Sequence, residues 1–258
     1  VFGKCSPEAP ITIMLVGLFV LSWLISFFIA YFVNRKKIKI NKYLEPNKEE
    51  VNSWRKDQAT IVFGILGWSF LGRSDVFLLA FLVSPSEVGA YFICLRLAEI
   101  LSFFSTVAYY IWGGRISNMI QEKRLIQAQK ILKKSSQLCI STSLAMLIVI
   151  WGFTEEILFF VNERFVGYVF LFKLSLLFVS LKASVGILHP MYYILGDQAF
   201  LGKLQWIIGI FFTFLVIALV PSYGLKACIF SLIFCQSVYI LISLSRLKIK
   251  HNLSLSPI

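Results

Sequence analysis

Four ionisable residues interrupt an apolar hairpin that runs from 71 to 117, in segments long enough to be membrane spans. Arg73 and Asp75 fall in the first segment of this hairpin, and Arg96 and Glu99 fall in the second. Each charge at the centre of a bilayer costs roughly 2.5–3.5 kcal/mol on insertion scales. We therefore expect these side chains to face a protein interior or a water-filled cavity rather than lipid.

The spacing of these residues predicts how they are arranged. Arg96 and Glu99 are three positions apart, so they share a helix face and could form a structural ion pair. Arg73 and Asp75 are two positions apart, about 200° around a helix, and cannot point the same way. One of them should face the cavity, while the other meets a neighbouring span or the interface. Asp75 could also pair with Arg73 or with a group on another span.

A second set of candidates lies near 182–190. Lys182 is close to the centre of an apolar run and has no carboxylate near it on its own helix, which makes it the best single candidate for holding an anion. His189 follows seven residues later on almost the same face. Pro190 comes directly after His189 and should kink the predicted span 165–194 near its cytoplasmic end. His189 could therefore serve instead to satisfy a backbone carbonyl that the kink exposes.

The composition is that of an integral membrane protein. The 258 residues are 58% hydrophobic and 15% charged, whereas soluble domains are about 45–50% apolar and about 25% charged. Because the chain starts at Val1 without a Met, we expect a piece of a longer protein. The first span and a basic loop would form residues 1–57, and the remaining spans would form 58–258. The apolar runs predict about seven spans, at 11–33, 58–82, 85–112, 136–153, 165–194, 204–219 and 225–244.

The formal charge of +12 lies in alternate loops. The stretches 34–57, 114–134, 196–204 and 246–251 hold 18 of the 25 Lys and Arg but only 6 of the 13 Asp and Glu, so they contain the whole excess. By the positive-inside rule these loops are cytoplasmic, which predicts an N-terminus outside and a C-terminus inside. The excess of basic residues then reflects the orientation of the chain in the membrane and its attraction to anionic membrane lipids. We expect no nucleic-acid partner.

Local patterns place the turns and surface helices. Ser84 and Glu87 match a capping box with Pro85 at the first helical position, so the spans on either side should form a tight hairpin. The third span should end near Gly113 and Gly114. The segment 118–137 alternates apolar and basic residues, which predicts an amphipathic helix on the cytoplasmic membrane surface.

The sequence offers no motif for an ATP site or for catalysis. It has no Walker A loop, no H-E-x-x-H and no G-x-S-x-G elbow. Its five cysteines form no C-x-x-C pair and are expected to be apolar filler, so we predict no metal or other cofactor and no enzymatic activity. A polytopic helical protein with a partly cationic interior and no ATP site suits a secondary transporter or flippase for an anionic or amphipathic solute.

The stretch RSDVFLLAFLVSPSEVGAYFICLRLAE, residues 73–99, resembles the polysaccharide transporter family. These are the O-antigen flippases of the multidrug/oligosaccharidyl-lipid/polysaccharide exporter superfamily. The family pattern is an Asp in a span, an S-x-x-E-V-G-x-Y turn and an Arg-Leu-Ala group, and 162–168 and 221–236 look like its later segments. Val76 departs from the family, which usually has a basic residue there. The family also has about twice as many spans.

The resemblance implies one lobe plus one helix of a two-lobed, MATE-like transporter, which would not transport alone. It implies a flippase in the bacterial inner membrane that moves repeat units linked to undecaprenyl diphosphate by alternating access. A polysaccharide polymerase and a chain-length regulator would be further partners. Arg96 and Lys182, with Arg73 as third choice, would hold the diphosphate, and Asp75 and Glu99 would orient these cations or take a coupling ion.

Two other functions remain open. A cation-coupled multidrug exporter of the same superfamily should have an interior dominated by carboxylates, whereas here the two charges are about balanced. A membrane-embedded enzyme of polysaccharide biosynthesis should show a long periplasmic loop or a catalytic His or Asp site, and the sequence shows neither.

Overall fold

The computed structural model describes residues 21, 24–26, 28 and 48–251. The chain divides into two compact units, Val1–Ser53 and Trp54–Ile258. All of the candidate residues belong to the second unit. Most of the predicted first span, 11–33, lies outside the described residues, as do 34–47 of the basic loop.

Six helical segments in the described residues are long and apolar enough to cross a bilayer, and none of these residues lies in a strand. The protein is therefore an all-α, multi-pass integral membrane protein, as predicted. The six segments correspond one to one with the spans predicted between 58 and 244. The elements are α2 (Lys48–Leu82), α3 (Pro85–Ala98), η1 (Glu99–Ser102), α4 (Phe103–Gln121), α5 (Leu125–Gly152), α6 (Thr154–Val161), η2 (Glu163–Tyr168), α7 (Val169–Ser184), α8 (Leu188–Ile194), α9 (Gln198–Tyr223) and α10 (Leu225–His251).

The predicted capping box between α2 and α3 is confirmed. The Glu87 backbone N–H donates to Ser84 Oγ at 3.4 Å, and the Ser84 backbone N–H donates to Glu87 Oε2 at 3.1 Å. Pro85 occupies the first turn of α3, where its missing N–H has no intrahelical partner to lose. This local chemistry closes the hairpin with almost no loop.

Two predicted boundaries between 112 and 137 are wrong. The helix α4 continues through Gly113, which the Tyr109 ring covers, and ends at Gln121. The segment 118–137 is not a separate surface helix, because the chain turns at Lys123, whose φ of 58° lies in the left-handed region. The remaining residues of this segment belong to α5, which runs without interruption from Leu125 to Gly152.

The predicted kink at Pro190 is present, as a break in the helix within the turn before the proline. The helix α7 ends at Ser184, and α8 begins at Leu188 with Pro190 in its first turn. A proline ring clashes with the carbonyl four residues before it, here that of Gly186, and has no N–H to bond it. Gly186 also lies against α4, because a Cβ added there would stand 2.5 Å from Ser105 Cβ.

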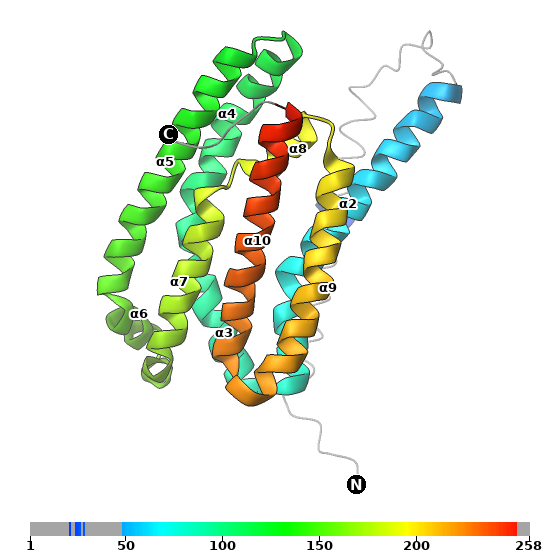
Figure 1. Cartoon of the computed structure of the whole chain (residues 1–258). Helices are drawn as coiled ribbons and strands as arrows, with labels where there is room; N and C mark the ends of the chain where they lie inside the picture. Colours follow the sequence, from blue (N-terminus) through cyan, green and yellow to red (C-terminus); the bar gives the residue numbers. More distant parts are fainter. Residues whose placement is uncertain (1–20, 22–23, 27, 29–47, 252–258) are drawn as a thin grey trace. The chain divides into compact units, whose positions relative to one another are not determined.

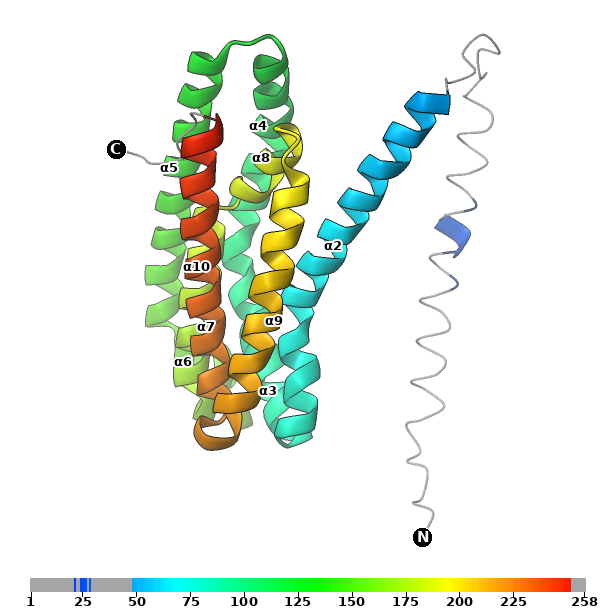
Figure 2. The same cartoon turned by 45° about the vertical axis from the view of Figure 1, so that its right-hand side comes forward.

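The helix α7 lies at the centre of the packing, in contact with α3, α5 and α10, while α10 packs against α9. Figure 1 shows α5, α7, α10 and α9 side by side in this order. The helix α2 crosses α9 closely at two glycines, since a Cβ added at Gly202 would stand 3.1 Å from Gly64 Cα. Figure 2 shows α2 next to α9, and Trp206 Nε1 donates to the Phe63 carbonyl across this crossing at 3.1 Å.

Candidate functional site

Two adjoining cavities, of about 250 and 300 Å³, lie among α2, η1, α7 and α10, and α4 and α8 also line the second. Because the same three side chains line both cavities, we treat the two as one site, the central cleft. The shared residues are Trp68 on α2, Lys182 on α7 and Gln236 on α10. The first cavity is also lined by Arg73 and Glu99, and the second by His189 and Tyr239.

Lys182 is the cation that both cavities share. Its Nζ lies 5.4 Å from the centroid of the Trp68 ring, close enough for a cation–π contact. None of the ion pairs or hydrogen bonds found between described residues involves its ammonium. A half-buried ammonium with only a ring as partner has unused capacity to hold an anion.

The charges around Lys182 are of both signs. Arg73 is exposed and lines the first cavity, as does Glu99. Glu99 Oε2 accepts from Arg96 Nη1 at 2.6 Å, and these side chains are 45% and 37% exposed. The pair that the spacing allowed is therefore formed. Glu99 is thereby engaged, and Arg73 and Lys182 are the lining cations that form no ion pair with a carboxylate of the described residues.

His189 lies in the second cavity among side chains. Its Nδ1 is 3.1 Å from Gln205 Nε2 and 3.5 Å from the Tyr239 hydroxyl, and its ring centroid is 4.5 Å from that of Trp68. The alternative reading, in which His189 satisfies a carbonyl exposed by the kink, does not match these contacts. The ring instead forms part of the polar and aromatic lining of the cleft.

Asp75 lies apart from the cleft. It is 4% exposed, and its Oδ2 accepts from the Tyr91 hydroxyl at 2.7 Å. Cys228 Sγ lies 3.5 Å from the same hydroxyl, so the group joins α2, α3 and α10. Asp75 Oδ1 is buried without a partner among the described residues. As the spacing predicted, Asp75 and Arg73 point in different directions.

The structure thus brings four of the six predicted site residues to the central cleft. Arg96 reaches it only through Glu99, and Asp75 does not line it. The lining residues that sequence reasoning missed include Trp68, Gln236 and Tyr239. The signal for Gln236 was present, because an uncharged amide in the apolar run of α10 has to find a polar neighbour. Nothing in the sequence marks Trp68 as a lining residue, because aromatic residues of membrane spans ordinarily face lipid or lie at the interface.

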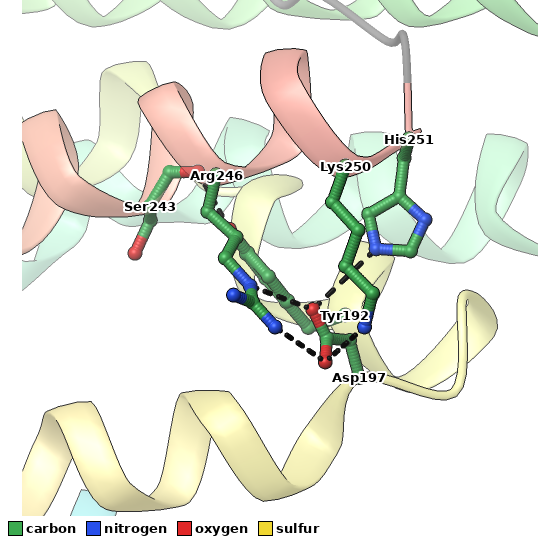
Figure 3. A network of polar contacts seen from close by, with 6 residues as sticks. All are labelled: Tyr192, Asp197, Ser243, Arg246, Lys250 and His251. Carbon is green, nitrogen blue, oxygen red and sulfur yellow. Dashed lines mark hydrogen bonds and ion pairs between the residues drawn. The ribbon is translucent and has the colours of Figure 1, made fainter.

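A second polar cluster lies at the turn between α8 and α9 (Figure 3). The Asp197 carboxylate accepts from Arg246 Nε at 3.1 Å and from Lys250 Nζ at 2.8 Å, and His251 Nε2 lies 3.4 Å away. Burial alone would raise the pKa of this carboxyl, but the hydrogen bonds from these bases outweigh burial and hold the pKa at about 2. Beside this cluster, the Tyr192 hydroxyl donates to the Ser243 carbonyl. These contacts fasten the turn to the end of α10.

The central cleft is therefore the place where a ligand could be held, whereas the Asp197 cluster has its carboxylate already satisfied. The cleft offers two cations, an amide and several aromatic rings, among them Trp68, His189 and Tyr239. Comparison of the chain with family models, curated proteins and solved structures finds no match.

Proposed function

We propose that this chain is one lobe of a flippase that moves polysaccharide repeat units linked to a polyprenyl diphosphate across the bacterial inner membrane. The single observation that carries the proposal is Lys182, an ammonium that lines both cavities of the central cleft and has no carboxylate partner among the described residues. A cation inside a membrane helix bundle is costly to insert and marks a substrate pathway by default.

The remaining lining suits a sugar next to a phosphate. Trp68 and His189 contribute aromatic rings to the lining, and the Gln236 amide can both donate and accept hydrogen bonds. The two cavities together fall within the roughly 300–1,000 Å³ typical of small-ligand sites. That volume fits a diphosphate with its first sugar, while the rest of the repeat unit would extend toward the second lobe that the family resemblance implies.

The engagement of the carboxylates favours an anionic substrate over a cationic drug. Glu99 is paired with Arg96, and Asp75 is buried against Tyr91 away from the cleft. A multidrug exporter would need a free carboxylate facing its substrate, and neither residue supplies one. In the proposed setting the N-terminus of this chain is periplasmic and its C-terminus cytoplasmic, and the polymerase and chain-length regulator act on the product.

The test is complementation of a strain that lacks the full-length gene and displays its surface polysaccharide. Deletion should cause lipid-linked repeat units to accumulate on the cytoplasmic side, and the full-length gene should relieve this. Lys182→Gln should lower surface polysaccharide at least tenfold, which corresponds to about 1.4 kcal/mol of lost binding. Arg73→Gln should lower it by a smaller factor, because Arg73 is exposed and lines only the first cavity.

The control is Lys173→Gln on the same helix. Lys173 Nζ also lies 5.4 Å from a tryptophan ring, that of Trp151, but Lys173 lines neither cavity. It should keep full activity at equal membrane abundance. Wild-type polysaccharide in the Lys182→Gln strain, or equal loss in both lysine variants, would contradict the assignment of the cleft. No accumulation on gene deletion would contradict the flippase itself.

A further inference from the structure

A groove of about 630 Å³ runs along the outer side of the α9–α10 hairpin, away from the central cleft. On α9 it is walled by residues spaced four apart, which form one ridge of a helix surface. These residues are Phe211, Leu215, Leu219 and Tyr223. On α10 the opposite wall is formed by Lys226, Phe230 and Phe234, again four apart. Two small residues, Ala227 and Ser231, form the floor and give the groove its depth.

The two ends of the groove differ in chemistry. One end is closed by Phe211 and Phe234, whose ring centroids are 6.3 Å apart. The other end lies at the tight turn between α9 and α10, where the exposed side chains of Tyr223 and Lys226 stand. This turn is at the lower edge of the bundle in Figure 1. The groove is thus apolar along its length and cationic at one end only.

The length of the groove matches one half of a bilayer. From Tyr223 to Phe211 the helix advances twelve residues, about 18 Å at the rise of an α-helix. Half of a hydrocarbon core of roughly 30 Å is about 15 Å. A chain that starts at the turn would therefore end near the bilayer midplane. This is the reach of a fatty acyl chain in one leaflet, and it is too short for a long isoprenoid tail.

The side chains that line the groove at the turn include a lysine and no carboxylate. Neither α9 nor α10 contains an Asp or Glu. No ion pair between described residues involves Lys226, whose Nζ lies 5.1 Å from the centroid of the Phe170 ring at the start of α7. An anionic headgroup here would therefore meet the attraction of the Lys226 ammonium.

We propose that this groove binds a phospholipid with an anionic headgroup, with one acyl chain along the α9–α10 groove and the phosphate beside Lys226. The site is separate from the proposed transport function, since no groove residue lines the central cleft. The bound lipid would act as a fixed part of the protein's outer surface, with its headgroup at the turn between α9 and α10.

The test is native mass spectrometry of the full chain in detergent, with added dioleoyl phosphatidylglycerol or dioleoyl phosphatidylcholine. The wild type should retain one phosphatidylglycerol with about fivefold preference over phosphatidylcholine, the factor expected for one lysine next to an anionic lipid. Lys226→Gln should abolish that preference. Lys173→Gln removes a lysine from α7, outside the groove, and should leave the preference intact.

The groove itself is tested by filling it. Leu215→Trp places a large ring between the two walls and should remove the retained lipid whatever its headgroup. Ile217→Trp, two residues on and 53% exposed outside the groove, should have no effect. A wild-type preference for phosphatidylglycerol in Lys226→Gln, or wild-type lipid retention in Leu215→Trp, overturns the proposal. If Leu215→Trp changes only the oligomeric state in the same spectra, the groove is a protein interface and the lipid assignment is wrong.

Discussion

Replacing Asp197 with Asn tests whether the polar cluster at the end of α10 stabilises the folded state. The pKa of Asp197 lies at about 2, against 3.8 for an unperturbed aspartate. A difference of this size is worth about 2.5 kcal/mol at neutral pH. Arg246 and Lys250 are 38% and 47% exposed, so solvent screening reduces it. We therefore expect Asp197→Asn to lower the free energy of unfolding by about 1–2 kcal/mol.

The pH dependence gives this prediction its sign. Because the pKa of the Asp197 carboxyl is depressed on folding, its contribution is complete above the unfolded pKa of about 4 and fades as the pH falls toward 2. The difference in unfolding free energy between wild type and Asp197→Asn should thus be constant from pH 7 to about 5 and shrink below pH 4. Unfolding in detergent by added dodecyl sulfate, followed by tryptophan fluorescence, measures this difference.

The control is an ion pair without burial. Glu122 lies 3.2 Å from Arg124, and both side chains are more than half exposed. Glu122→Gln should therefore change the unfolding free energy by less than about 0.5 kcal/mol at any pH. The reasoning is refuted if Asp197→Asn costs no more than Glu122→Gln at pH 7, or if its cost stays constant into the acid range.

Three further predictions concern contacts inside the bundle. Tyr91→Phe should cost about 1–3 kcal/mol of unfolding free energy, because it leaves the buried Asp75 carboxylate without its 2.7 Å hydrogen bond. Gly202→Val should cost about 1–3 kcal/mol, since a Cβ at this position stands 3.1 Å from Gly64 Cα on the facing helix. Ser84→Ala should cost about 0.5–2 kcal/mol through loss of the α3 cap. The same dodecyl sulfate titration measures all three.

The same substitutions at exposed positions are the controls for Tyr91→Phe and Gly202→Val. Tyr110 is 77% exposed, and a Cβ added at Gly114 would meet nothing within 4 Å. Tyr110→Phe and Gly114→Val should each stay within about 0.5 kcal/mol of the wild type. Equal losses in the test and control variants would show that the packing contacts do not carry the stability assigned to them.

The features that the sequence predicts well are local. The cap at Ser84 needs only a partner three residues away, and Arg96 finds Glu99 at the same spacing. The number of spans between 58 and 244 likewise follows from runs of apolar residues. Each of these depends on the chemistry of one segment, so no knowledge of the packing is needed.

The features that the sequence does not predict come from packing between segments. Lys182 and Trp68 meet because α7 and α2 line the same cleft, and nothing near either residue indicates the other. Arg246 and Lys250 share one helix face, but their partner Asp197 lies in a different turn of the chain. The amphipathic pattern after Lys123 fits either a surface helix or the polar start of a spanning helix. Only the continuity of α5 decides between the two.

The short 3₁₀ segment η1 shifts the helical phase of the spanning segment Pro85–Gln121. A residue of a 3₁₀-helix turns by about 120°, whereas a residue of an α-helix turns by about 100°. Over the four residues Glu99–Ser102 the difference adds up to about 80°. A single helical wheel drawn through 85–121 therefore assigns the faces of α4 wrongly by almost a quarter turn. Substitution scans along residues 85–121 should therefore be plotted on one helical wheel for α3 and on another for α4.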